Sequence, residues 1–122
     1  MTVSKDRRAS DNAAFAEFRE KAAAWREMRP KPNFPEGALR YKILAEEAVR
    51  NNDFSGAASF YEQALAIHPL WPEGQFKAAL LYGDAGMFDK AIGHMKRYLE
   101  LTPNAPEAPM ARDKIQIWAG KP

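Results

Sequence analysis

Hydrophobic residues recur every three or four positions along most of this chain, which is the period of an α-helix. The first such segment begins at Asp11, and its apolar face carries Phe15, Phe18, Ala22 and Trp25. Residues 1–10 are polar, charged and without any period, so the sequence predicts a disordered tail there.

Proline and glycine divide the pattern into segments. Three prolines within residues 29–35 forbid a continuous helix and predict a short rigid connector. Proline suits the first turn of a helix and also stops a preceding one, so each proline marks a boundary. The expected helices are 11–29, 35 to about 50, 54–68, 72 to about 82, 88–101 and 106–118. No segment alternates at period two for long enough to be a strand, and the predicted fold class is all-α.

The pattern repeats within the chain. A shift of 34 residues places Phe54 on Phe88, Ala57 on Ala91, Leu65 on Leu99, Pro69 on Pro103, Pro72 on Pro106 and Glu73 on Glu107. A period of 34 residues made of helix, turn, helix and a closing proline resembles the tetratricopeptide repeat (TPR) family.

Small and aromatic residues carry this resemblance. The first unit matches at Tyr41, Leu44, Ala45, Ala57, Tyr61, Ala64 and Pro69, and lacks the expected aromatic at Ala48. The second matches at Ala78, Ala79, Tyr82, Ala91, Met95 and Pro103, and departs at Gln75 and Tyr98. In such a register, small residues let paired helices approach closely while aromatic residues fill the gaps between units.

The resemblance implies one α-solenoid domain with covers at both ends, because solenoid units cannot bury their faces alone. We expect an N-terminal helix and connector over 11–34, repeats over 35–71 and 72–105, and a capping helix over 106–122. The N-terminal helix is expected to cover the first helix of repeat one, including Tyr41 and Leu44. The C-terminal helix is expected to be a rotated cap whose apolar face holds Ala111, Ile115 and Trp118.

The resemblance also implies a peptide-binding groove lined by the first helix of each repeat. Its positions here are Leu39, Lys42, Glu46, Val49, Arg50, Glu73, Phe76, Leu80 and Asp84. Phe76 and Leu80 lie one turn apart and off the internal face, so they are expected to meet either a partner or a flanking helix. Some family members bind chaperone C-termini through Lys and Asn residues. Glu46 stands where an Asn is needed and repels a carboxylate, so this ligand is disfavoured.

Composition and charge narrow the function further. The chain of 122 residues has no cysteine, which excludes disulfides, thiolate metal sites and a cysteine nucleophile. Residues 1–42 carry ten Lys and Arg against six Asp and Glu, which is too few and too dispersed for a nucleic-acid surface. No phosphate-binding loop, nucleophile elbow or zinc-protease motif is present. His68 and His94 have no carboxylate at ligand spacing, so no metal site is expected.

These observations favour a non-enzymatic scaffold that binds a peptide or helix segment of a partner protein in the groove, with no cofactor. The alternative is a structural module that self-associates as a homodimer through its N-terminal amphipathic helix. We expect no nucleic-acid partner and no membrane span. With neither a signal peptide nor a transmembrane segment recognised, the compartment stays open, the cytoplasm being slightly favoured.

Overall fold

The computed structural model describes residues 2–122, with side chains described from Asn12 onward, and this part of the chain is helical without any strand. The helices are α1 Thr2–Glu27, α2 Glu36–Arg50, α3 Phe54–Ile67, α4 Pro72–Asp84, α5 Phe88–Leu101 and α6 Ala108–Ala119. The expected all-α class is confirmed.

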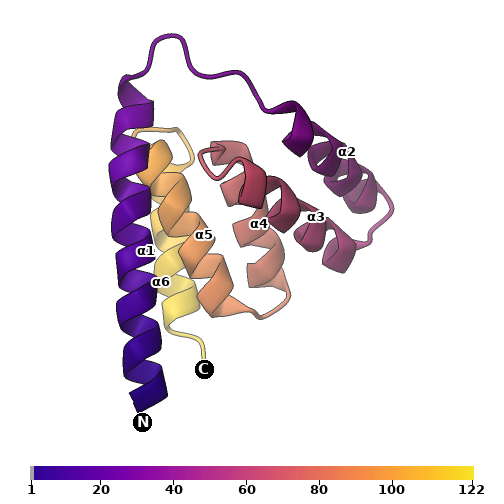
Figure 1. The fold of residues 1–122 in the computed structure, drawn as a ribbon. Coiled ribbons are helices and arrows are strands. Elements are labelled where there is room, and N and C mark those ends of the chain that lie inside the picture. The colour runs from indigo at the N-terminus through magenta and orange to yellow at the C-terminus, as the bar shows by residue number, and fades with distance from the viewer. Residues whose placement is uncertain (1) are drawn as a thin grey trace.

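Helices α2 to α6 follow one another in space as they do in sequence (Figure 1). Helix α2 packs on α3, α4 packs on α5, and the two hairpins meet through α3 and α4. Helix α6 packs on α5, at the opposite end of the row from α2. This order follows from short connections, which place consecutive helices beside each other.

The two hairpins match at a shift of 34 residues. Both bounds of α3 recur in α5 at that shift. The turns match as well, because the left-handed backbone of Asn52 (φ 60°) recurs at Gly86 (φ 78°). The N–H of Asp53 donates to the Ala48 carbonyl at 2.8 Å, and that of Met87 to Tyr82 at 2.9 Å. Glycine and asparagine suit this conformation because positive φ crowds other side chains.

Alanine lines the contacts between the helices. Ala45 and Ala79 on the first helices, and Ala57 and Ala91 on the second, have no exposed surface. A methyl group at a crossing lets two backbones come close, which the large side chains around it then fill. Tyr61, Trp71 and Met95 are large buried residues of the same core.

Helix α1 begins earlier than the sequence predicts. It starts at Thr2 rather than Asp11, so most of the predicted disordered tail over 1–10 is helical backbone, and Met1 lies outside the described residues. No glycine or proline occurs before Pro30, so nothing in residues 2–10 interrupts a helix that tertiary contacts stabilise further along.

The expectation that the N-terminal helix covers the first helix of repeat one is wrong. Helix α1 lies along the α5 side of the molecule and packs chiefly on α5, and the connector after it runs across to α2 (Figure 1). Phe18 and Ala22 of α1 are buried with Leu101. Arg19 pairs with the Glu100 carboxylate at 3.0 Å, and Arg26 donates to the Glu100 carbonyl. The connector 28–35 permits this crossing because eight extended residues span about 26 Å.

Helix α6 has the rotated face that the sequence predicts. Ala111 and Trp118 are buried and Ile115 is half-buried, whereas Pro109, Arg112, Asp113 and Gln116, which a third repeat would bury, are exposed. The Trp118 indole lies over Gly83 of α4, where an added Cβ would fall 2.4 Å from Cζ2. Helix α6 therefore closes the α4–α5 hairpin.

Candidate functional site

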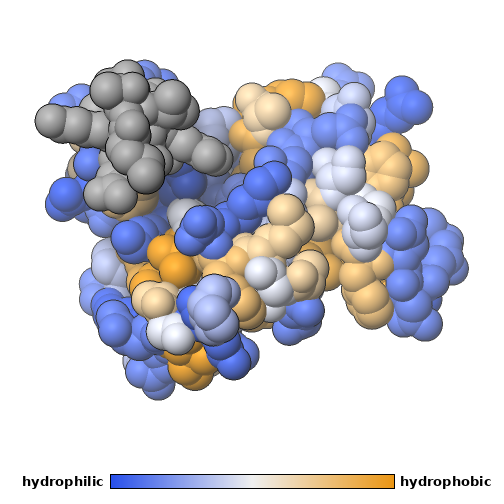
Figure 2. Space-filling model, turned by 90° about the horizontal axis from the view of Figure 1, so that it is seen from below, coloured by the Kyte–Doolittle hydropathy of each residue, from blue (hydrophilic) through white to orange (hydrophobic). Residues whose placement is uncertain are grey.

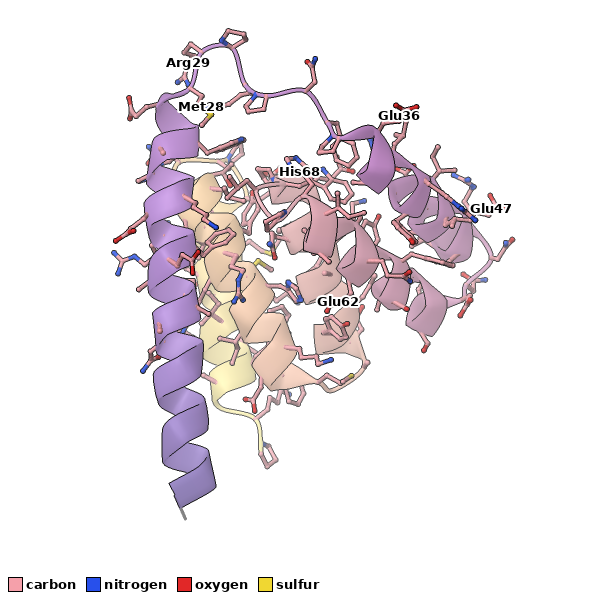
Figure 3. All side chains as sticks on the ribbon, in the orientation of Figure 1. Met28, Arg29, Glu36, Glu47, Glu62 and His68 are labelled. Atoms are coloured by element: carbon pink, nitrogen blue, oxygen red, sulfur yellow. The ribbon has the colours of Figure 1, made fainter. Side chains whose placement is uncertain are left out.

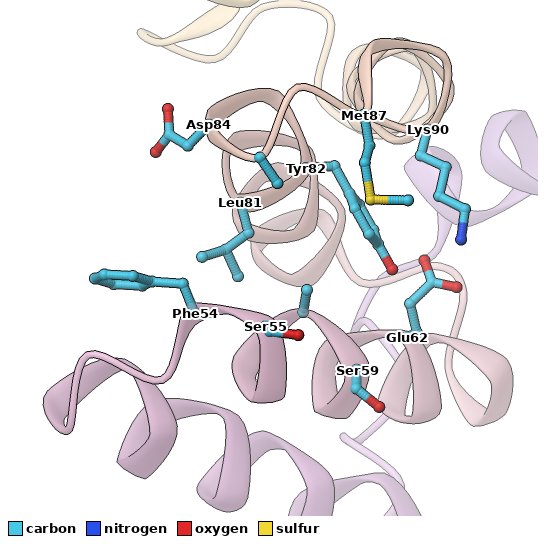
Figure 4. A pocket seen from close by; sticks show the side chains of 11 residues that line it. Phe54, Ser55, Ser59, Glu62, Leu81, Tyr82, Asp84, Met87 and Lys90 are labelled. Carbon is cyan, nitrogen blue, oxygen red and sulfur yellow. The ribbon is translucent and has the colours of Figure 1, made fainter.

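A largely apolar opening lies between α3 and the α4–α5 turn, and we name it the α3–α5 cavity (Figure 4). Its volume is about 710 Å³, within the range of pockets that take small ligands or side chains. It is lined by Phe54, Ser55, Ala58, Ser59, Glu62, Leu81, Tyr82, Asp84, Ala85, Met87 and Lys90. From below, the molecule shows hydrophobic groups gathered in its middle between hydrophilic margins (Figure 2).

Two large hydrophobic side chains form the lips of this cavity. Phe54 is 52% exposed and Met87 is 44% exposed. Phe54 opens α3, where the Asp53 carboxylate caps the helix by accepting from the Gly56 N–H at 3.0 Å. Met87 is the residue before α5. Both side chains stand at the start of a helix, where the preceding turn leaves them without neighbours on the solvent side.

One lining residue of the cavity, Glu62, belongs to a polar network with His94 and Gln75. His94 Nε2 lies 2.5 Å from the Glu62 carboxylate, and His94 Nδ1 lies 2.7 Å from the Gln75 amide oxygen. The Gln75 amide nitrogen donates to the Pro69 carbonyl at 2.9 Å, which orients its oxygen toward the ring. Both ring nitrogens of His94 are therefore engaged by side chains of the protein itself.

The charges in this network have local effects. The hydrogen bond from His94 holds the pKa of Glu62 below its ordinary value, against the opposing effect of burial. Burial and the nearby Glu62 carboxylate raise the pKa of Tyr82 to about 12. The Tyr82 ring stacks on His94 with centroids 5.6 Å apart, and Lys90 Nζ lies 5.2 Å from the Tyr82 centroid. A stacked, hydrogen-bonded imidazole has neither nitrogen free to take a proton from a substrate.

Sequence reasoning missed this site. Glu62 and His94 are 32 residues apart, on α3 and α5, so no local motif joins them. The expectation that His94 lacks a nearby carboxylate is therefore wrong in three dimensions. The available signal was Gln75, a polar residue at a position where the repeat pattern expects a buried aromatic. Gln75 is 2% exposed and bonds to both Pro69 and His94.

The nine predicted groove residues lie on α2 and α4, and only Asp84 lines the α3–α5 cavity. On α2, Leu39, Val49 and Arg50 are exposed. Lys42 is half-buried, and its Nζ lies 5.5 Å from the Phe34 ring centroid in the connector. The Lys42 ammonium group is thus within cation–π range of an aromatic residue of the same chain.

Two of the acidic residues predicted for the groove affect the pKa of the same tyrosine. Burial, followed by the charges of Glu46 on α2 and Glu73 on α4, raises the pKa of Tyr61 to about 12. Glu46 is half-buried and Glu73 is exposed. The structure thus brings these two carboxylates to one side of the hairpin contact.

Phe76 and Leu80 pack against other residues of the same molecule. Both are half-buried and pack against the core, and the Phe76 ring lies 4.9 Å from that of Tyr98 on α5. Of the two outcomes that the sequence left open for this pair, packing within the molecule accounts for most of their surface. They are weaker candidates for partner contacts than Phe54 and Met87.

Within residues 2–122, none of the helices combines the length and apolar character that crossing a membrane requires. Among the described side chains, no three His, Asp or Glu residues gather closely enough to hold a metal ion. No protein-family model matches the chain, and no curated protein is similar to it in sequence.

Proposed function

We propose that this chain is a non-enzymatic protein-interaction module made of two TPR-type repeats, and that it binds a peptide or helix segment of a partner protein. The observation that carries the proposal is the α3–α5 cavity, whose lips Phe54 and Met87 expose about half of their surface to water. Exposed apolar groups around a concave opening are typical of sites that accept an apolar side chain.

The repeat assignment rests on the 34-residue match of the hairpins. Both bounds of α3, the left-handed turn residues Asn52 and Gly86, and the buried alanines recur at that shift. Chains of this architecture bind partners far more often through surfaces than through catalytic groups. Both ring nitrogens of His94 are occupied by Glu62 and Gln75, which agrees with a structural rather than a catalytic role for this histidine.

The polar residues of the cavity indicate how a partner segment is oriented. Glu62 and Lys90 stand at one side and Asp84 at the other, with Leu81 between them (Figure 4). A large apolar side chain entering between Phe54 and Met87 would supply the affinity. Polar groups beside it would select the direction of the segment, since rim charges contribute more to orientation than to affinity.

The test is selection of peptides from a displayed random library, followed by measurement of affinity by isothermal titration calorimetry. We expect selected peptides to carry a large apolar residue and to lose at least about tenfold in affinity for Phe54→Asp and Met87→Asp, because a buried anchor contributes about 1.4 kcal/mol or more. Ile117→Asp on α6, where Ile117 is 54% exposed, is the matched control. Peptides that bind these lip variants and the wild type equally would refute the proposed site.

A further inference from the structure

The outer face of α2 carries exposed apolar side chains that the chain leaves uncovered. Helix α2 packs chiefly on α3, and α1, expected to cover it, lies on α5 instead. Ile43 is 52% exposed and Leu39 is 43% exposed on this face. The first helix of a helical row leaves apolar groups in water when nothing covers it.

Charges on this face alternate in a self-complementary order. At 100° per residue, five exposed residues fall in one stripe about 80° wide. In chain order they are Glu36, Arg40, Ile43, Glu47 and Arg50. Figure 3 shows Glu36 and Glu47 on the outer side of α2, away from α3. The stripe reads acidic, basic, apolar, acidic, basic, with the apolar residue at its centre.

We propose that this stripe is a homodimer interface in which α2 packs antiparallel on α2 of a second copy. A twofold axis at Ile43 places Glu36 opposite Arg50 of the partner subunit. It also brings Arg40 to within one residue, about 1.5 Å along the axis, of Glu47 of the partner subunit. Each pair occurs twice because a twofold interface is isologous. A parallel pairing would instead place like charges opposite each other, so the charge order selects the antiparallel arrangement.

The occupant is a second copy because one sequence supplies both halves of this complementarity. An unrelated partner would have to match the same order of charges around an apolar centre, whereas the chain already carries that match. The dimer leaves the α3–α5 cavity free, since that cavity is lined by α3, α4 and the start of α5. The inference therefore stands independently of the proposed partner binding.

The interface is small, so the dimer is weak. Helix α2 has 15 residues and a length of about 22 Å. A single helix pair lies at the low end of specific interface areas, and we expect a dissociation constant on the order of 10 to 100 μM. Its exposed ion pairs are screened by salt, so the affinity falls as ionic strength rises.

Sedimentation equilibrium over a concentration series tests the apolar centre. We expect the wild-type chain to shift from monomer to dimer as its concentration rises through the range of about 10 to 100 μM. Ile43→Asp should remain monomeric, because it places two carboxylates on the twofold axis. Ile117→Asp, a control of similar exposure on α6, should dimerise like the wild type. Circular dichroism of each variant checks that its helices are retained.

Charge exchange tests the register. Arg40→Glu and Glu47→Arg each place like charges opposite each other twice, and each should weaken the dimer at least about tenfold. The double variant should recover the wild-type affinity. An equimolar mixture of the two single variants should form heterodimers, because one then carries only acidic and the other only basic residues at these positions. This result cannot arise from the intrahelical Glu47–Arg50 pair, which is 2.6 Å long in one chain.

Three results would overturn the proposal. The first is a wild-type chain that stays monomeric up to about 1 mM, well above the expected dissociation constant. The second is a dimer that survives Ile43→Asp, which would place self-association on another surface such as α1. The third is a mixture of the single charge variants that forms no heterodimer.

Discussion

The Glu62–His94–Gln75 network makes a sharp prediction about stability, since it joins α3, α4 and α5 through side chains alone. In His94→Leu the leucine still packs on the Tyr82 ring, but both hydrogen bonds of the imidazole are lost. The Gln75 amide oxygen then has no donor, at a residue that is only 2% exposed. The Glu62 side chain is 41% exposed and regains water.

The loss of these two hydrogen bonds sets the expected decrease in the free energy of unfolding. An unpaired buried acceptor costs about 1 to 3 kcal/mol, and a partly exposed charge-assisted hydrogen bond contributes about 1 kcal/mol. His94→Leu should therefore lower the free energy of unfolding by about 2 to 4 kcal/mol, or the Tm by about 10 °C for a chain of this size. Urea denaturation followed by tryptophan fluorescence measures it. Lys90→Met, which removes a nearby exposed charge outside the network, should change stability by less than about 0.5 kcal/mol.

The direction of the Glu62 pKa shift determines how the stability effect of His94→Leu changes with pH. The His94 hydrogen bond lowers the pKa of Glu62 in the folded protein from 4.5. A lowered carboxyl pKa contributes stability above the unfolded value, and this contribution is lost as pH falls through the folded value. The stability difference between the wild type and His94→Leu should therefore narrow as pH falls below 4.5, the ordinary pKa of the Glu62 carboxyl. A difference that stays constant over this range would refute the assigned role of Glu62, as would a Glu62→Leu and His94→Leu double-mutant cycle with no coupling energy.

Three further predictions concern packing. Ala91→Leu adds three carbons at a fully buried helix contact and should cost about 1 to 3 kcal/mol by overpacking; an unchanged urea midpoint would contradict the close approach of the helices there. Gly83→Val places carbon atoms within the Trp118 indole, so α6 should detach and Trp118 fluorescence should shift to the red, whereas an unshifted spectrum would mean that the indole packs elsewhere. Deletion of residues 1–32 should expose α5 around Leu101 rather than Tyr41 and Leu44, so hydrogen exchange should accelerate in α5 and stay unchanged in α2; faster exchange in α2 instead would contradict the docking of α1.

The docking of α1 also decides which surfaces are free. Its apolar face is engaged within one molecule through Phe18 and Ala22, which makes it a poor candidate for the self-association considered from the sequence. Lys31 holds its C-terminal end by donating to the Trp25 and Arg26 carbonyls at 2.6 and 2.9 Å. With α1 placed on α5, large apolar side chains stay exposed on α2 and at the α3–α5 cavity, and also at Ile67 and Ile117.

Local features of the sequence were sufficient to predict where most of the helices begin and end. Prolines and the 3.6-residue period predict α2, α3 and α5 to within a residue or two, because a missing N–H or an apolar stripe acts within one turn of its own position. The 34-residue shift likewise predicts the buried alanines, since each hairpin brings its two helices together through a short turn. The start of α1 was missed because residues 2–10 carry no apolar period, although they contain nothing that breaks a helix.

Contacts between distant segments were decided only by the tertiary structure. The amphipathic face of α1 could pack on any apolar surface. Its packing on α5, rather than on α2, which is the next helix in the sequence, depends on the contact of Phe18 and Ala22 with Leu101 and on the Arg19–Glu100 ion pair. Likewise, His94 finds Glu62 across 32 residues. An apolar period specifies that a face will be buried but not against what, because hydrophobic attraction is non-directional and the partner is chosen by shape and charge across the whole fold.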